Sequence, residues 1–145
     1  TQERDPDPKR IEILNDFAER SFYARKNAQI SSGFEKFVIR YQNLRHILLS
    51  NCDNSQIVAV SEHHGITKYF NSGIIGTPPS KELRAEAIRS EFPDSQILSL
   101  SDSESDAVIA RKSNFDFLYI NEFARGCEPW ILENEYRVES FSSCI

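Results

Sequence analysis

Short apolar runs alternate with amphipathic segments between residues 46 and 120, and this alternation most restricts the folds open to the chain. The expected elements are, in chain order, a strand at 46–50, a helix at 56–64, a strand at 73–76, a helix at 81–92, a strand at 96–100, a helix at 105–112 and a strand at 115–120. Strands joined through helices in such short steps form parallel sheets through right-handed crossovers. The sequence therefore predicts an α/β fold: a three-layer, Rossmann-like parallel sheet with helices on both faces.

Residues 56–64 could form either a helix or a strand. They fit a helix for which Gly65 is a plausible C-cap. The β-branched residues Val58 and Val60 also suit a strand, and periodicity alone does not decide between the two.

Two further helices are expected before the alternating region. Apolar residues recur at helical spacing over 9–28, and again from Phe34 to Leu44, where Ser32 is the expected N-cap. The charges and prolines of residues 1–8 indicate a flexible leader. We expect a helical, cap-like segment at 9–30 and the α/β core at 31–145, with a last strand within 136–141.

Composition narrows the class of protein. The 145 residues suffice for one hydrophobic core, and a net charge of −5 without a basic cluster argues against nucleic acid and anionic membranes as partners. The three cysteines are widely spaced and odd in number, so neither a disulfide framework nor a zinc site is indicated, and a cytoplasmic location is expected. Because the sequence contains no methionine, we expect it to be a piece of a longer chain.

Polar side chains follow successive expected strands. Ser50 and Asn51 end the first strand, Lys81 begins the helix after the second, and Asp102 and Asp106 follow the third. Loops at the carboxyl ends of parallel strands converge, so these groups could share one pocket suited to phosphoryl chemistry with Mg²⁺. Taken singly, each has a plainer explanation: a strand end, a solvated lysine, or acids that favour a helix N-terminus.

The segment 46–120 resembles the latter part of the haloacid-dehalogenase-like (HAD) hydrolase core over about 75 residues. HILLSN is similar to the second motif, an apolar strand ending in Ser or Thr, here Ser50. EHHGITKYFNSGIIGTPPSK is similar to the stretch leading to the motif lysine, here Lys81. SDSESD is similar to the fourth motif, with Asp102 and Asp106 as its two aspartates and Ser101 where the family prefers glycine.

This resemblance implies a Mg²⁺-dependent phosphohydrolase acting on a small phosphorylated substrate. Ser50, with Asn51 beside it, would bind the transferred phosphoryl group, and Lys81 would neutralise it. Asp102 would help to hold Mg²⁺, while Asp106 would support the metal or anchor Lys81. Segment 9–30 would be what remains of the helical cap of such enzymes.

The family's nucleophile motif is missing from the sequence. It is an Asp-x-Asp that follows an N-terminal strand and forms an aspartyl-phosphate. Asp5-Pro6-Asp7 has the spacing, but the residues before it are too polar for a buried strand, so we interpret it as a coincidence. Either the nucleophile strand precedes Thr1 in a longer chain, or the domain is a non-catalytic binding or scaffold domain.

Two weaker resemblances remain as alternatives. Residues 73–97 and 114–123 also resemble one lobe of a solute-binding protein, and Glu62 with Asp102 and Glu104 faintly resembles a Toprim nuclease. Neither accounts for HILLSN, so both rank below the HAD interpretation.

Overall fold

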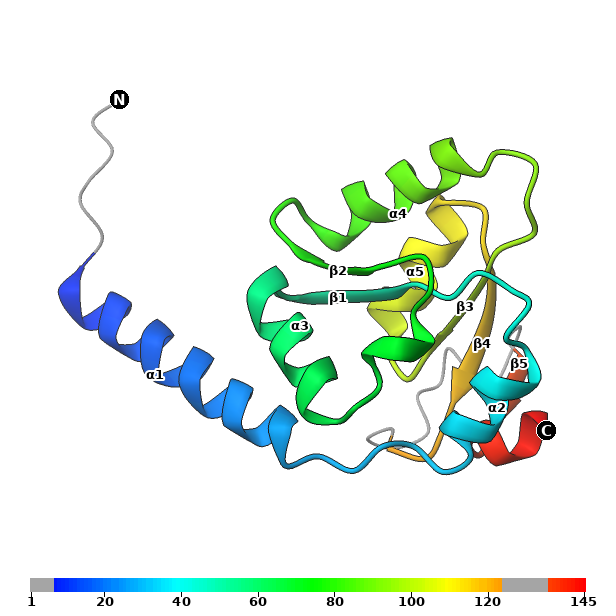
Figure 1. Cartoon of the computed structure of the whole chain (residues 1–145). Helices are drawn as coiled ribbons and strands as arrows, with labels where there is room; N and C mark the ends of the chain where they lie inside the picture. The colour runs from blue at the N-terminus through cyan, green and yellow to red at the C-terminus, as the bar shows by residue number, and fades with distance from the viewer. Residues whose placement is uncertain (1–6, 124–135) are drawn as a thin grey trace.

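The computed structural model describes residues 7–123 and 136–145. The elements alternate as predicted (Figure 1) and are, in order, α1 (Pro8–Lys26), α2 (Phe34–Arg40), β1 (Leu48–Asp53), α3 (Asn54–His63), the 3-10 turn η1 (Thr67–Tyr69), β2 (Ile74–Thr77), α4 (Lys81–Glu91), β3 (Leu98–Ser101), α5 (Glu104–Lys112), β4 (Asp116–Ile120), β5 (Tyr136–Val138) and η2 (Phe141–Cys144). The order confirms the α/β class. It also decides the open alternative, because the segment after β1 is the helix α3.

Side-chain N-caps mark the starts of helices α3, α4 and α5. The Asp53 carboxylate accepts from the backbone N–H of Ser55 at the start of α3, at 2.9 Å. Ser80 caps α4, and Ser103 caps α5 by accepting from the N–H of Asp106 at 3.3 Å. These oxygens satisfy amide groups that a first helical turn leaves without partners, so each strand passes into its helix within a few residues.

Two predicted boundaries are wrong. Helix α2 follows Gly33, whose φ of 78° is left-handed, and no side chain caps it, so the predicted cap by Ser32 is absent. A side chain at position 33 would also place its Cβ 2.5 Å from the backbone nitrogen of Ser142. Strand β1 continues to Asp53 instead of ending at Ser50, because Asp53 still pairs with Thr77 of β2.

The strands pair in parallel, in two groups. β1 pairs with β2, while β3, β4 and β5 form a second sheet in that order. The prediction of parallel strands covered by helices is confirmed, but the single sheet is replaced by two within the described residues. Helices α3 and α4 lie on opposite sides of β1 and β2 (Figure 1).

The tightest part of the core lies between α5 and the second sheet. Ala107 and Ala110 of α5 pack on Phe117 and Tyr119 of β4, and all four are buried. A smaller buried set on α3, Ile57 and Val60, faces the first sheet. The small alanines let α5 approach β4 closely. The N-terminus of α5 lies at the carboxyl end of β3 because only two residues separate the two elements.

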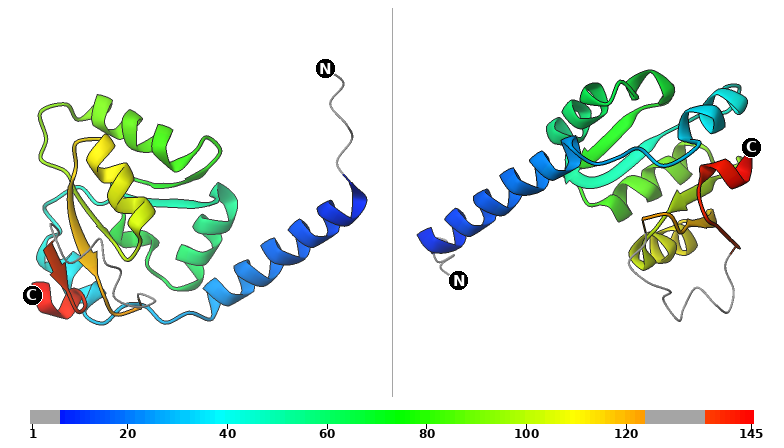
Figure 2. Two further views of the ribbon diagram at one scale, coloured as in Figure 1. Left: turned by 180° about the vertical axis from the view of Figure 1, so that it is seen from behind. Right: turned by 90° about the horizontal axis from the view of Figure 1, so that it is seen from below.

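Helix α1 projects away from the rest of the molecule (Figure 2). It has no buried residue, and among the described residues its hydrogen bonds to the body are made at its C-terminal end. The backbone carbonyl of Arg25 bonds the imidazole Nε2 of His64 at 2.9 Å, and the Arg25 guanidinium donates to Gln56 at 3.5 Å. The expected N-terminal helix is therefore present. Within the described residues no helix combines the length and apolar character needed to cross a membrane.

Candidate functional site

A cavity of about 470 Å³ lies where three strands end. Its lining comes from the carboxyl-terminal part of β1, from the N-terminal end of α4 and from the first two turns of α5. Helices α4 and α5 follow β2 and β3. The residues are Asn51, Ser80, Lys81, Glu82, Glu104, Ser105, Val108 and Ile109. This is the edge at which open α/β sheets bind their ligands.

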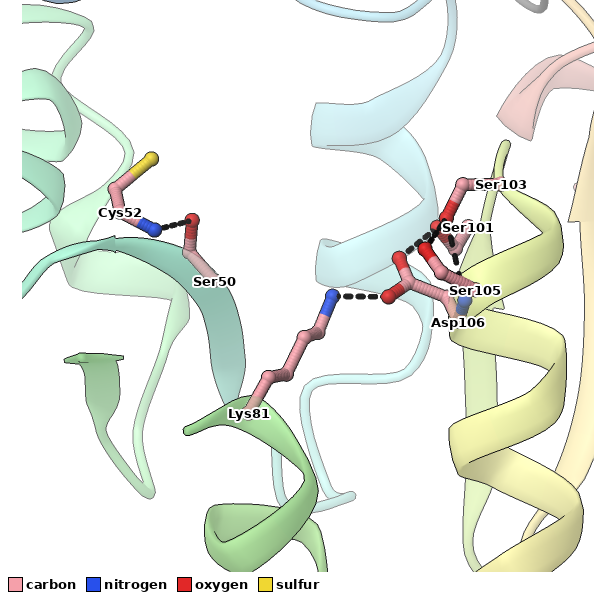
Figure 3. Close-up of polar contacts among 7 residues, drawn as sticks. All are labelled: Ser50, Cys52, Lys81, Ser101, Ser103, Ser105 and Asp106. Atoms are coloured by element: carbon pink, nitrogen blue, oxygen red, sulfur yellow. Dashed lines mark hydrogen bonds and ion pairs between the residues drawn. The ribbon is translucent and has the colours of Figure 1, made fainter. Parts of the chain in front are cut away.

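An ion pair between α4 and α5 borders this cavity (Figure 3). The Lys81 ammonium donates to Oδ1 of Asp106 at 2.6 Å, and the two side chains are only 14% and 12% exposed. The hydroxyl of Ser101, the last residue of β3, donates to Oδ2 of the same carboxylate. Both oxygens of Asp106 are thus occupied, and the carboxylate fixes the position of Lys81.

The local sequence explains how Lys81 and Asp106 meet. Each lies in the first turn of a helix that a serine caps directly after a short loop. A carboxylate in the first turn of α5 also interacts favourably with the positive end of the helix dipole. An ammonium has three N–H donors, and among the described residues Asp106 is the only partner found for this one. The remaining donors can bind an anion.

The other predicted phosphate-binding residues have different surroundings. Asn51 is exposed and lines the same cavity as Lys81, and its backbone carbonyl accepts from the Thr77 hydroxyl at 3.1 Å. The Ser50 hydroxyl accepts from the backbone N–H of Cys52 at 3.1 Å and is not part of the cavity lining. The structure therefore brings Asn51, Lys81 and Asp106 together, with Ser50 one residue from the cavity.

The described residues do not form a complete metal site. Asp102 is exposed in the turn between β3 and α5 and is not part of the cavity lining. Asp106, the second predicted ligand, holds Lys81 and Ser101. No cluster of three or more His, Cys, Asp or Glu side chains occurs in 7–123 or 136–145. Mg²⁺ prefers octahedral oxygen ligation, so Asp102 and Asp106 would need further oxygen ligands to hold it.

Ser101 is the site residue that sequence reasoning missed. In the sequence, Ser101 is a departure from the glycine that the resemblance favours, whereas in the structure its hydroxyl donates to the Asp106 carboxylate. The available signal was a hydroxyl at the end of an expected strand, five positions before an aspartate in the following helix.

The sequence suggests that the Asp5-Pro6-Asp7 spacing is a coincidence and not the nucleophile motif, and Asp7 lies within the described residues. Asp7 is the N-cap of α1, and its carboxylate accepts from the backbone N–H of Lys9 at 3.0 Å. Asp5 and Pro6 lie outside the described residues. Asp7 therefore has a structural role far from the cavity.

Comparison with known proteins supports the fold. A solved haloacid dehalogenase-like family hydrolase from Streptococcus pneumoniae superposes with a TM-score of 0.76 at 17% sequence identity, covering 95% of this chain and 70% of the other. No protein-family model matches the sequence, and no curated protein matches it. The chain thus has a HAD-like α/β fold.

Proposed function

We propose that this domain is the phosphate-binding part of a HAD-type phosphohydrolase. The observation that carries the proposal is the Lys81–Asp106 pair, set at the carboxyl ends of the strands in a HAD-like fold. A lysine held by a largely buried carboxylate is pre-positioned, so little side-chain entropy is lost when it binds an anion.

The substrate class follows from the donors around the cavity. Lys81 offers charged N–H groups and Asn51 an amide, and such donors suit the non-bridging oxygens of a phosphate monoester. Ser50 would add its hydroxyl if its side chain turns away from the N–H of Cys52. In this proposal Asp106 is a positioning residue, because it acts on phosphate through Lys81.

Turnover requires a nucleophile and a hard cation in addition to these residues. A carboxylate nucleophile would attack phosphorus, and Mg²⁺, where held, would supply positive charge beside the phosphoryl oxygens. Asp102 is the carboxylate we assign to the cation. No nucleophilic carboxylate can be assigned among the described residues, so phosphate binding is the property to test first.

Binding of inorganic phosphate tests the proposal directly. We expect Lys81→Ala to weaken binding by at least about tenfold, since it removes the charged donor, and Lys81→Arg to restore part of it. Lys112→Ala is the matched control, because Lys112 also bonds a carboxylate across α4 and α5 but at an exposed place. Calorimetric titration or ³¹P NMR measures the affinities; equal affinity in Lys81→Ala and the parent protein contradicts the proposal.

Hydrolysis of p-nitrophenyl phosphate with Mg²⁺ separates an enzyme from a non-catalytic domain. If the domain is an enzyme, we expect the parent protein to hydrolyse this ester and the Lys81→Ala and Asp102→Ala variants to lose that activity. The second candidate function is a binding or scaffold domain. Two observations favour it. Lys81 and Ser101 already bond both oxygens of Asp106, and the described residues do not form a complete metal site. Phosphate binding without turnover under any divalent cation supports that second function for this chain.

A further inference from the structure

The charged side chains around the cavity of about 470 Å³ do not balance one another. The described lining carries one cationic side chain, Lys81, and two carboxylates, Glu82 and Glu104. Lys81 is paired with Asp106 at 2.6 Å (Figure 3), and Glu82 is paired with the Lys112 ammonium at 3.0 Å. Neither pair carries a net charge, so the cavity keeps the negative charge of Glu104.

The carboxylate of Glu104 is free to bind a ligand. Glu104 is the first residue of α5, and its side chain is exposed. Within 7–123 and 136–145 it has no ion-pair or hydrogen-bond partner. The positive end of the helix dipole favours a carboxylate at this place, but that interaction uses neither of its oxygens as an acceptor. Both oxygens can therefore accept hydrogen bonds from a group in the cavity.

Apolar side chains complete the part of the wall that α5 contributes. Val108 lies one helical turn after Glu104, and Ile109 lies one turn after Ser105, so each pair shares a face of the helix. Val108 is 37% exposed and can be covered by a carbon chain. The described lining contains no aromatic ring, which a quaternary ammonium group would favour.

On the basis of the proposed function, in which Lys81 binds phosphate, we propose that the substrate is a phosphate monoester of a short primary-amino alcohol. The ammonium group of the alcohol donates to Glu104, and the carbon chain between the two charges lies against Val108. Glu104 is thus a specificity-determining residue of the site.

Charge balance favours this class over an ester of an uncharged alcohol. A phosphate monoester is close to a dianion at neutral pH, so by itself it adds negative charge to a cavity that already holds Glu104. An ammonium group on the alcohol offsets that charge. Its N–H groups also form charge-assisted bonds to a carboxylate, which are stronger than the bonds that an uncharged hydroxyl would donate.

Pairs of esters that differ only in the ammonium group test the proposal. The amine probes are aminoethyl, aminopropyl and aminobutyl phosphate, each with its amine at the end of the chain, and the matched probes carry a methyl group in its place. At about pH 8 and without divalent cations, both phosphates are doubly charged and the amine is protonated. At one or more chain lengths the amine should bind about three- to fivefold more tightly, which is the effect of an exposed charge pair. Calorimetric titration measures the affinities.

A variant that removes one charge assigns this preference to Glu104. Glu104→Gln keeps the size of the side chain and should abolish the preference. It should bind inorganic phosphate at least as tightly as the parent protein, because a neighbouring negative charge is lost. Glu86→Gln is the matched control, since it removes the same charge from an exposed position of α4 outside the cavity lining and should keep the full preference. Phosphate binding by each variant shows that its site is folded.

Two results overturn this inference and leave the proposed function in place. One is equal affinity of every amine and its methyl counterpart in a protein that binds inorganic phosphate. The other is a preference that persists unchanged in Glu104→Gln, which would place the ammonium group elsewhere. Absence of phosphate binding by the parent protein would instead remove the proposed function and this inference together, so the two failures are distinguishable.

Discussion

At the scale of single residues, two ion pairs join the same helices in different surroundings. Lys81–Asp106 is largely buried, whereas Lys112–Glu82, also between α4 and α5, is 64% and 50% exposed. Removing one partner of a buried pair leaves the other charge without compensation, while exposed pairs contribute little. The two pairs therefore differ in their expected contribution to stability.

We predict that Asp106→Asn lowers the free energy of unfolding by about 1–3 kcal/mol, below the value for a fully buried pair because some solvent reaches it. Glu82→Gln, the matched control, should cost less than about 1 kcal/mol. Urea denaturation followed by circular dichroism measures both. Equal losses of unfolding free energy in the two variants would mean that the burial of the Lys81–Asp106 pair does not increase its contribution to stability.

The double variant Lys81→Met with Asp106→Leu separates stability from function. Replacing a buried pair by apolar side chains of similar size is often neutral for stability. We expect stability near that of the parent protein, together with loss of phosphate binding. Retained phosphate binding would remove Lys81 from the site.

At the scale of elements, Glu122 ties the segment between α1 and α2 to the end of β4. The Ser31 hydroxyl donates to its carboxylate at 2.5 Å, and the backbone N–H of Ser32 donates to the same oxygen at 2.8 Å. These bonds, that of the Ser31 hydroxyl first, hold the pKa of Glu122 below its ordinary value. The charged form is therefore favoured by folding.

The sign of the resulting pH dependence follows. Because the folded pKa lies below the unfolded one, the unfolded chain binds more protons in the window between them, and stability rises with pH there. The contribution of Glu122 should be complete above the pKa of the unfolded chain, about 4.3, and should be lost as the pH falls through the lower pKa of the folded protein. The stability difference between the parent protein and Glu122→Gln should shrink over that range.

Ser31→Ala provides the control, because it removes the hydroxyl donor and should raise the pKa of Glu122 toward its ordinary value. An NMR titration of the Glu122 carboxyl carbon measures this shift, and denaturation at several pH values measures the stability. A pKa that is the same in Ser31→Ala as in the parent protein would contradict the assignment.

At the scale of the whole molecule, α1 contributes little to the fold. It has no buried residue, and large apolar side chains on its first half are exposed, among them Ile13 (68%) and Phe17 (68%). Its described hydrogen bonds to the body come from Arg25, near its end. The division of the chain into a helical segment at 9–30 and a core at 31–145 stays a prediction.

We predict that deleting residues 1–17 changes the free energy of unfolding by less than about 0.5 kcal/mol. Val38→Ala in α2, where Val38 is 4% exposed, should cost about 1–3 kcal/mol and shows that the measurement detects a core defect. A loss of more than about 1 kcal/mol on deletion would show that α1 belongs to the cooperative unit.

The sequence by itself determined the order and type of the elements. Apolar periodicity and cap residues are local signals, so the alternation from 46 to 120 and the start of α4 at Ser80 were predictable. Local signals also placed Lys81 at the start of a helix, and Asp102 and Asp106 directly after the third strand. The prediction that Ser32 caps α2 was wrong, because the helix follows Gly33. The close contact with Ser142, far away in the chain, leaves no room for a side chain at position 33.

Only the tertiary structure decided which of these groups meet. It paired Lys81 with Asp106, recruited Ser101 and left Asp102 exposed, and it divided the strands into two sheets. Side-chain contacts and strand neighbours depend on how elements distant in the chain pack against each other, and the periodicity of one segment carries no information about its partner.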